Sequence, residues 1–554
     1  MQAAPGAPLQ TEVLVVGAGP VGLSLAIELG RRGVDTLVVE QNARVGYQPR
    51  AKLTNVRSME HMRRWGIAGK MRSASPLPPD LPTSVIFATR LFGYPLAFFE
   101  NAFFGSQERN ELFSEPAQWI PQYCVEAVLR DHAATLPQVD LRFSTRLESA
   151  TQSADAVVAE ITDLVSRERR AVRAAFLIGA DGARSLVRQL IGARMEGSHA
   201  FAQNFNVILR APGLGEIHPQ ARGIMYWLLN ADCPAIMHPL DRDDTWVFSL
   251  QGTDGRTEMD ESDIRFRLAK AVGRQVDCEI LHCDSWAAHR LIADRYRAGR
   301  ILLAGDACHL HPPAGGYGMN MGIGDAVDLG WKLTATLHGW GGPSLLSAYE
   351  SERRPVHARV IGEATQNYSV LATDLVRDNL EQEGSAGDEA RRALGAEILD
   401  TKVREFKTLG VVLGYHYSGS PLVVPDGSAP PTEHFMHYEP SAHPGCLAPH
   451  LWLSENESLY DRFGDGFTLL QTRPGGRGDA ERAASAAAAR NMTMTVCAPG
   501  DPRLPDLYGA RYALIRPDQH VAWRGDRIPD DVESLLDRVS GGQPAVDDPL
   551  YAGR

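Results

Sequence analysis

A glycine-rich turn between a short apolar strand and a helix is the feature that most constrains this chain. Residues 11–16 (TEVLVV) are apolar and β-branched, which predicts a buried parallel strand. The glycines of a G-x-G-x-x-G turn follow this strand directly: Gly17, Gly19 and Gly22. A helical pattern and a second apolar run come next, and that run ends at Glu40. This order predicts a βαβ unit that binds a dinucleotide.

Each residue of this turn has a physical role beside a pyrophosphate. Gly17 permits the tight turn, Gly19 lets the backbone approach the phosphates, and Gly22 lets the helix pack close to the sheet. The helix N-terminus offers free N–H groups and the positive end of its dipole. Glu40 would accept hydrogen bonds from the adenosine ribose. The turn alone does not distinguish NAD from FAD.

Two later apolar strands end in aspartate beside glycine. Residues 176–178 run into Gly179-Ala180-Asp181-Gly182, and residues 301–304 stop at Gly305-Asp306. Downstream of a nucleotide turn, such a pair is what a protein would use to hold the ribityl chain and pyrophosphate of an extended FAD. A Pro/Gly-rich loop precedes a helix that we expect to start near Met319 and Asn320. Its free N–H groups would stabilise negative charge on the reduced flavin.

With these motifs the sequence resembles the single-component flavoprotein aromatic hydroxylases, the para-hydroxybenzoate hydroxylase-like class. Within this class it is most similar to the phenol-type branch, which includes 2,4-dichlorophenol and 2-hydroxybiphenyl hydroxylases and polyketide-tailoring oxygenases. The matching segments are VVGAGPVGLSLAIEL, PRAKLTNVRSMEHMRRWGI, PQYCVEAVL, IGADGARSLVR, LLAGDACHLHPPAGGYGMNMGIGDAVDLGWKL and LLSAYESERRPV. The segments HPGCLAPHLWL and ALIRPDQHVAWRG extend the resemblance toward the C-terminus.

The resemblance implies FAD as the bound cofactor and assigns its contacts. The residues assigned to FAD are Gly17, Gly19, Gly22, Glu40, Arg50, Gln122, Asp181, Asp306, Pro312, Gly318, Met319 and Asn320. Among them, Asp181 belongs to the motif linked to both FAD and NAD(P)H, and Asp306 to the ribityl-binding motif. The chain departs from the usual pattern at Cys308, Tyr317, Gly324 and Asp328, and none of these departures removes a backbone contact.

The resemblance also implies a reaction. NADPH or NADH reduces the flavin transiently, O₂ forms a flavin C4a-hydroperoxide, and one oxygen is inserted into a phenol-like aromatic ring. One alternative on the same fold is a natural-product tailoring or antibiotic-modifying oxygenase that acts by Baeyer–Villiger insertion or epoxidation. Another alternative is a flavin-binding protein without turnover. Glu40 is assigned to FAD, so it does not indicate whether the reductant is NADH or NADPH.

Three residues are candidates for the substrate site. Tyr226 and Trp227 lie on an expected strand, so only one of them can face a ligand. Trp227 matches a substrate-lining tryptophan of the 2-hydroxybiphenyl type. Lys52 stands where phenol-type relatives often carry histidine. If Lys52 faces the site, desolvation would lower its pKa and it could deprotonate a phenol or attract an anionic one; a solvated surface lysine is the alternative.

A metal site is not expected. His309 and His311 alternate on a loop, but the sequence places no third ligand beside them, which favours loop packing. The seven cysteines form no C-x-x-C pair, which argues against a zinc site or a disulfide framework.

The expected fold class is α/β, with a Rossmann-like FAD-binding domain, an inserted antiparallel-sheet substrate domain and a C-terminal thioredoxin-like domain. We place the FAD-binding domain at 1–190 and 280–370 and the substrate sheet at 191–279, with the loop 76–104. A helical segment and linker would cover 371–449, and the thioredoxin-like domain, without C-x-x-C, 450–554.

The net charge and the N-terminal residues limit which partners and which location we expect for this protein. The formal net charge of −12 argues against a nucleic-acid or anionic-membrane partner, because phosphate groups bind basic surfaces. Residues 1–10 lack the basic and apolar regions of a signal peptide. We therefore expect a cytoplasmic homo-oligomer that binds a small aromatic substrate, with no membrane or nucleic-acid partner.

Overall fold

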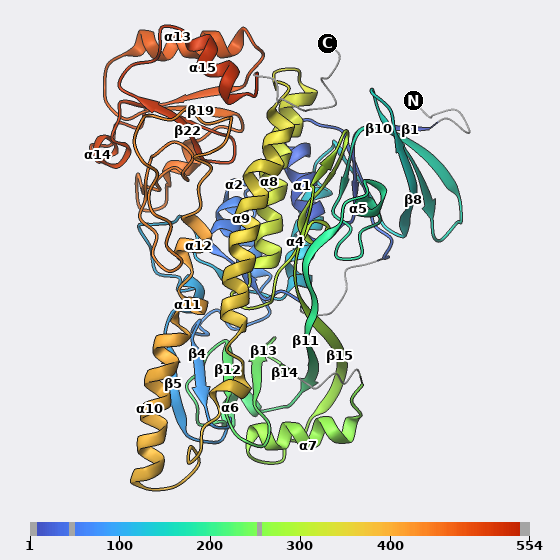
Figure 1. Ribbon diagram of the computed structural model, residues 1–554, viewed down its shortest axis with the longest axis vertical. Coiled ribbons are helices and arrows are strands. Elements are labelled where there is room, and N and C mark those ends of the chain that lie inside the picture. Colours follow the sequence, from blue (N-terminus) through green and yellow to red (C-terminus); the bar gives the residue numbers. More distant parts are fainter. Residues whose placement is uncertain (1–7, 44–49, 252–257, 543–554) are drawn as a thin grey trace.

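The computed structural model describes residues 8–43, 50–251 and 258–542 (Figure 1). Its first sheet is built around β1 (Leu9–Val16), which pairs in parallel with β10 (Arg169–Gly179) and β2 (Thr36–Val39). Parallel pairing continues to β17 (Ile301–Leu303) on one side and β7 (Val139–Arg142) on the other. Because these strands run in one direction, their carboxyl ends meet at one edge, where parallel α/β sheets bind ligands.

The remaining elements of this region complete the sheet and cover it. The strands are β8 (Thr145–Gln152), β9 (Val157–Asp163) and β16 (Arg297–Ala298). The helices are α1 (Pro20–Gly30), α2 (Val56–Arg64), α3 (Ala68–Ser73), α4 (Gln122–Ala133), α5 (Leu186–Leu190), α8 (Tyr317–Leu337) and α9 (Leu345–Tyr368). A short ladder joins β3 (Leu53–Thr54) to β6 (Gln118–Trp119). α8 starts close to the expected position.

A second, largely antiparallel sheet lies below the first in Figure 1. Its strands in spatial order are β18 (His309–Leu310), β15 (Glu279–Ala293), β11 (Met195–Arg210), β14 (Thr245–Gln251), β13 (Ala235–Pro239), β12 (Met225–Leu228), β4 (Val85–Ala88) and β5 (Pro95–Phe99). The segment 76–104 therefore supplies edge strands, and β15 extends the sheet beyond the expected boundary at 279.

The two faces of this sheet pack against different partners. α7 (Glu261–Val272) covers one face, where its Ile264 and Leu268 contact a cluster that includes Tyr226. The opposite face contributes Trp227 to a cluster with Tyr317 at the start of α8. Only the second face can therefore contribute directly to a site beside α8. α6 (Leu214–Ile217) connects β11 to β12.

The C-terminal residues form a four-stranded sheet in the order β20-β19-β21-β22. Its elements are β19 (Phe467–Gln471), α13 (Arg477–Ala488), β20 (Met494–Cys497), α14 (Leu504–Tyr508), β21 (Tyr512–Ile515), β22 (Val521–Gly525) and α15 (Val532–Val539). β19 pairs in parallel with β20 and antiparallel with β21. This is the thioredoxin-like arrangement that the sequence predicts, and with the two other sheets it confirms the expected fold class.

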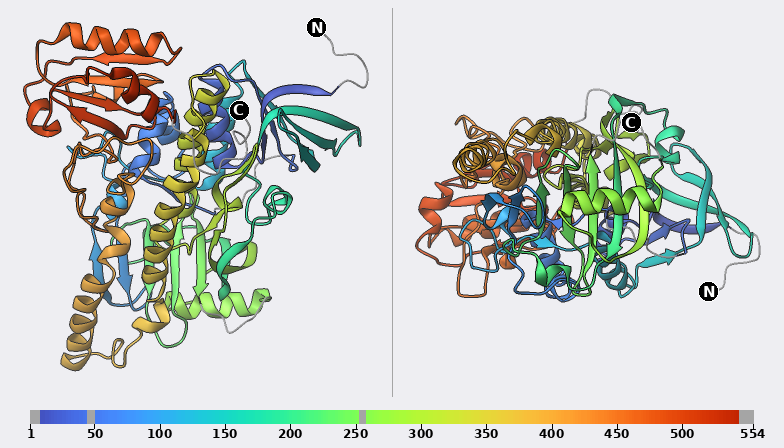
Figure 2. Two further views of the ribbon diagram at one scale, coloured as in Figure 1. Left: turned by 45° about the horizontal axis from the view of Figure 1, so that its top comes forward. Right: turned by 90° about the horizontal axis from the view of Figure 1, so that it is seen from below.

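In the described part of the chain, three α-helices follow α9 before the C-terminal sheet begins. They are α10 (Ser385–Thr401), α11 (Val403–Phe406) and α12 (Leu409–Leu413). α10 packs against β5, and the C-terminal sheet lies at the opposite end of the molecule from it (Figure 2). Among the described residues, no helix combines the length and the apolar character needed to cross a bilayer.

Candidate flavin and substrate site

The glycine-rich turn leaves open space beside only one of its glycines. Gly17 has a φ of +105°, and a Cβ there would lie 2.3 Å from the carbonyl oxygen of Ala180. A Cβ on Gly22 would lie 1.9 Å from the carbonyl oxygen of Gly17. A Cβ on Gly19 would meet nothing within 4 Å. The protein itself therefore requires Gly17 and Gly22, whereas Gly19 borders space that a ligand can approach.

The N-terminus of α1 lies at this open position. Gly19 is its N-cap residue, and no side chain accepts a hydrogen bond from the first N–H groups of the helix. The Glu40 carboxylate accepts from Ala18 N at 3.0 Å and from Asn42 N at 2.8 Å, so it fixes the turn. Free N–H groups at a helix start are an anion site, which fits a pyrophosphate.

Asp181 and Asp306 lie at the ends of two neighbouring strands, but their surroundings differ. Asp181 accepts from Ser185 Oγ at 2.5 Å and from Val187 N at 3.1 Å, so it also caps the start of α5. The side chain of Asp306 is exposed although Gly305 and Ala307 on either side are buried. Surrounding protein atoms raise the pKa of the Asp306 carboxyl, and the charges of His309 and Arg50 oppose this shift. An accessible carboxylate in crowded surroundings fits a hydroxyl-bearing ligand such as the ribityl chain.

Arg50 and Gln122 lie on the same side of the site as Asp306. Gln122 begins α4; its Oε1 accepts from Ala51 N at 3.2 Å and its backbone N–H donates to Ala51 O at 2.8 Å. Burial raises the pKa values of both Asp306 and Glu126, and the charge of the exposed Arg50 opposes this shift at each. The structure therefore brings these two predicted positions near the ribityl motif.

The loop from Pro312 to Asn320 is tied to the strand that follows Lys52. Asn320 Oδ1 accepts from Asn55 N at 2.9 Å, and its Nδ2 donates to Leu53 O at 2.9 Å. α8 begins without a side-chain cap, and a Cβ on Gly318 would meet nothing within 4 Å. Met319 and Pro312 are buried. A second uncapped helix start with open space therefore lies directly beside Lys52.

Lys52 is partly buried and not fully solvated. Burial lowers the pKa of its ammonium from 10.5 to about 8, and no charged neighbour among the described residues offsets this effect. The carbonyl of Lys52 accepts from Ile120 N at 2.6 Å, which fixes its backbone against β6. Of the two interpretations that the sequence left open, partial burial favours a desolvated lysine, and its role at the site stays a prediction.

The two aromatic candidates on β12 are both core residues. Tyr226 packs on the α7 side, its hydroxyl accepts from Gly223 N at 3.1 Å, and burial raises its pKa to about 12. Trp227 is on the other face, but its ring stacks on Phe87 at 5.2 Å and lies under the Lys402 ammonium at 4.4 Å. The strand alternation predicted opposite faces correctly. Both residues are closely packed, and their substrate-lining role stays a prediction.

Sequence reasoning missed two residues beside Lys52. His238 on β13 is buried, and its ring meets that of Trp119 edge-on, with centroids 6.1 Å apart. Burial lowers the pKa of His238 far below its usual value, and the charge of Lys52 adds to this effect. No local motif marks either residue, because they reach Lys52 only through the pairing of β3 with β6 and through the fold of the second sheet.

His309 belongs to a buried hydrogen-bond network, whereas the His311 ring meets that of His309 edge-on at 4.9 Å and forms no hydrogen bond with the described residues through its nitrogens. His309 Nε2 lies 2.7 Å from Asp325, and Cys308 is close enough to complete a possible ligand set. However, Asp325 also accepts from Arg353 Nε at 2.8 Å and lies 2.9 Å from His357 Nε2. Burial alone would raise the Asp325 pKa, but His357 and Arg353 hold it well below its usual range. An adjacent guanidinium repels a cation, so we interpret the cluster as loop packing.

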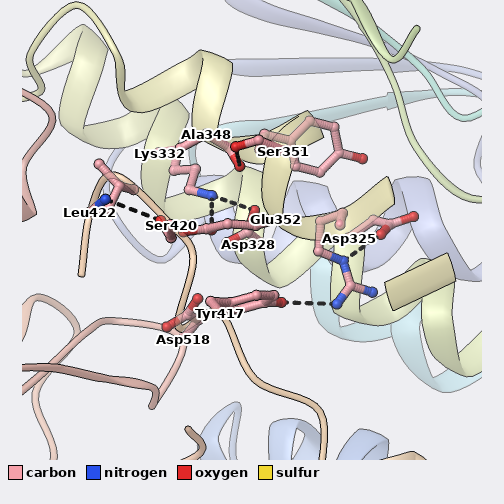
Figure 3. Close-up of polar contacts among 12 residues, drawn as sticks. Asp325, Asp328, Lys332, Ala348, Ser351, Glu352, Tyr417, Ser420, Leu422 and Asp518 are labelled. Atoms are coloured by element: carbon pink, nitrogen blue, oxygen red, sulfur yellow. Dashed lines mark hydrogen bonds and ion pairs between the residues drawn. The ribbon is translucent and has the colours of Figure 1, made fainter. Parts of the chain in front are cut away.

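A second buried ionic network joins α8 and α9 to the C-terminal domain, and Figure 3 shows the part of it in which Lys332 contacts Asp328 and Glu352. Arg516 donates to Glu352 Oε1 at 2.6 Å and to Asp328 Oδ1 at 3.1 Å. Lys332 donates to Asp328 at 2.7 Å and to Glu352 at 2.5 Å, while Asp518 accepts from Arg516 at 2.6 Å. Asp328, one of the departures from the usual family pattern, therefore forms an ion pair with Arg516 of the C-terminal domain.

Comparisons with known proteins identify the family. Residues 10–364 match the FAD binding domain family, and residues 441–543 match the family described as aromatic-ring hydroxylase, C-terminal. The chain belongs to the flavoprotein aromatic-ring hydroxylases. This confirms both the expected family and an FAD-dependent hydroxylase enzyme, and the open space and uncapped helix starts described above fit its cofactor.

Individual members of this family match over nearly the whole chain. Tetracenomycin B2 monooxygenase-dioxygenase of Streptomyces olivaceus is 33% identical, with 96% of this chain and 98% of that protein covered. 2,4-Dichlorophenol 6-monooxygenase of Delftia acidovorans is 29% identical over 96% and 98% of the two chains. The structure of the rebeccamycin biosynthetic enzyme RebC with reduced flavin aligns with a TM-score of 0.89, at 35% identity and 97% and 100% coverage.

Proposed function

We propose that this protein is an FAD-dependent, NAD(P)H-consuming monooxygenase that uses O₂ to hydroxylate a phenol-like aromatic ring. The observation that carries the proposal is the position of Lys52. Asn320 at the start of α8 donates to the carbonyl of Leu53, the residue after Lys52, so a partly buried cation lies beside the loop assigned to the flavin ring. Such a cation raises electron density on a phenol by favouring its ionised form.

Different parts of this chain would bind the cofactor and enclose the substrate. Bound FAD, reduced by NADH or NADPH, would supply the oxygen-activating chemistry. Gly19 and the start of α1 would hold its phosphates, and Asp306 its ribityl hydroxyls. The second sheet would close the substrate site from below and exclude water. The dichlorophenol and tetracenomycin enzymes among the relatives support an aromatic substrate but do not choose between one ring and several.

The test is turnover by the FAD-loaded protein with NADH or NADPH, O₂ and a panel of phenols and hydroxylated polycyclic aromatics. We expect at least one compound to accelerate NAD(P)H oxidation and to give a product that is one oxygen atom heavier, with all ring carbon bonds intact. A lactone or an epoxide would instead support the tailoring alternative. No product from any compound would contradict the proposal and favour a flavin-binding protein without turnover.

The cytoplasmic location and the homo-oligomeric state stay predictions from the sequence. The division into domains at 190, 279, 370 and 449 is likewise proposed. Gel filtration of the FAD-loaded protein would measure the oligomeric state directly, and limited proteolysis would show where the chain is cut between folded units.

A further inference from the structure

Three side chains beside the flavin loop bring hydrogen-bond donors together. They are Lys52, Trp119 and His238, which together we term the donor cluster. His238 is buried, whereas Lys52 and Trp119 are partly buried. Trp119 Nε1 and both ring nitrogens of His238 are inaccessible to solvent and form no hydrogen bond within the described part of the chain. No charged neighbour among the described residues offsets the desolvation of Lys52. Unsatisfied buried donors and a partly desolvated charge are costly, so their grouping in one place needs an explanation.

The donor cluster is held together by the backbone. Trp119 pairs with Leu53 in the β3–β6 ladder, and Lys52, the residue before Leu53, accepts from the N–H of Ile120, the residue after Trp119. The Trp119 and His238 rings meet at an interplanar angle of 83°. His238 is 5% exposed and comes from β13 of the second sheet. The cluster thus connects the flavin loop with the sheet that faces it.

The chemistry of these groups selects a ligand atom. Lysine ammonium and tryptophan N–H can only donate, and a neutral imidazole always carries one N–H. No carboxylate takes part in the cluster. A complementary ligand atom must therefore accept several hydrogen bonds and gain from a positive charge, which describes an ionised oxygen.

We propose that the donor cluster binds an ionised oxygen of the substrate, so that the enzyme selects acidic phenols and hydroxyquinones that enter as anions. The proposal rests on the proposed function and specifies its substrate class. In this arrangement Lys52 acts as a charge partner and not as a base. At neutral pH an ammonium with a pKa of about 8 is mostly protonated, so it cannot accept a proton from the substrate.

Binding of two matched probes to the FAD-loaded protein tests this proposal. 2-Hydroxy-1,4-naphthoquinone ionises readily, whereas 2-methoxy-1,4-naphthoquinone has the same rings and no acidic proton. Calorimetric titration without reductant gives both affinities, so the result does not depend on turnover. If the protein binds the anionic probe but does not hydroxylate any substrate, the binding proposal stands and only the proposed function fails. We expect about tenfold or more preference for the hydroxy compound, as for a charged hydrogen bond.

Three variants test whether the donor cluster causes the preference for the hydroxy over the methoxy compound. Lys52→Met should reduce it to about one, since methionine keeps a similar unbranched shape without the charge. Trp119→Phe keeps a ring and removes only the N–H, so it should weaken the preference a few-fold even if Lys52→Met folds poorly. Lys270→Met, at an exposed lysine paired with Asp232, should leave the preference unchanged. Failure of the hydroxy compound to bind, equal affinities of the two probes, or a preference that survives in Lys52→Met would each overturn the proposal.

Discussion

Replacing Lys52 with methionine should stabilise the FAD-loaded protein in the absence of substrate. Its pKa of about 8 in the folded chain compares with 10.5 for an ordinary lysine. Each pKa unit corresponds to 1.36 kcal/mol, so a charged Lys52 costs about 3 kcal/mol in the folded state. Methionine removes this cost and fills a similar volume. A residue that only stabilised the fold would show the opposite effect.

The pH dependence of this effect has a defined sign. Below pH 8 the lysine is protonated in both the folded and the unfolded chain, so the full cost of about 3 kcal/mol is present. Between pH 8 and 10.5 the unfolded chain binds more protons than the folded one, and stability therefore rises with pH. The advantage of Lys52→Met should decrease to about 2 kcal/mol at pH 9 and vanish above pH 10.5.

Differential scanning calorimetry at pH 7 and pH 9 measures this difference. For a chain of 554 residues the unfolding entropy is about 1.2 kcal/mol/K, so we expect Tm to rise by about 3 °C at pH 7 and by less at pH 9. The matched control is Lys332→Met, which removes the partner of buried Asp328 and Glu352 and should destabilise by about 3 kcal/mol. A lower Tm for Lys52→Met, or a gain that does not change with pH, would refute the reasoning.

Three further predictions concern the cofactor, coupling and the C-terminal domain. Gly19→Ala should leave the Tm of the FAD-free protein unchanged but weaken FAD binding about tenfold or more. Gly17→Ala should lower the Tm of the FAD-free protein and also weaken FAD binding. Equal FAD affinities of Gly19→Ala and the unchanged protein in fluorescence titrations would contradict this. Lys52→Ala should reduce hydroxylation more than NAD(P)H oxidation, with the difference released as peroxide, and unchanged coupling would count against it. Arg516→Met should cost about 3–5 kcal/mol in urea unfolding, compared with about 0–1 kcal/mol for Arg490→Met at an exposed pair.

The parts of this fold that depend on local sequence could be predicted well. The turn at Gly17, the strand ends at Asp181 and Asp306, and the start of α8 all follow from short-range rules about glycine conformation and helix termini. Alternation along β12 predicted that Tyr226 and Trp227 face opposite sides. These features need only a few neighbouring residues to be defined.

The substrate side depends on contacts that a local pattern does not encode. Whether Lys52 is solvated or buried depends on Trp119 and His238, which lie far from it in the sequence and reach it only in the folded chain. Trp227 matches a substrate-lining position by resemblance, and the sequence did not show that Phe87 stacks on its ring and that the Lys402 ammonium lies over it. A resemblance identifies equivalent positions, but the packing around each position decides what its side chain can contact.

The C-terminal domain has a structural connection to the flavin site that its sequence does not reveal. The Arg516 guanidinium lies over the Tyr417 ring at 5.1 Å, and the Tyr417 hydroxyl accepts from Arg353 at 3.0 Å. Arg353 binds Asp325, which in turn accepts from the backbone N–H of Gly305 at 3.1 Å. Gly305 immediately precedes the accessible Asp306. Buried polar networks tolerate few alternative geometries, so docking of this domain also restrains the strand end assigned to the ribityl chain.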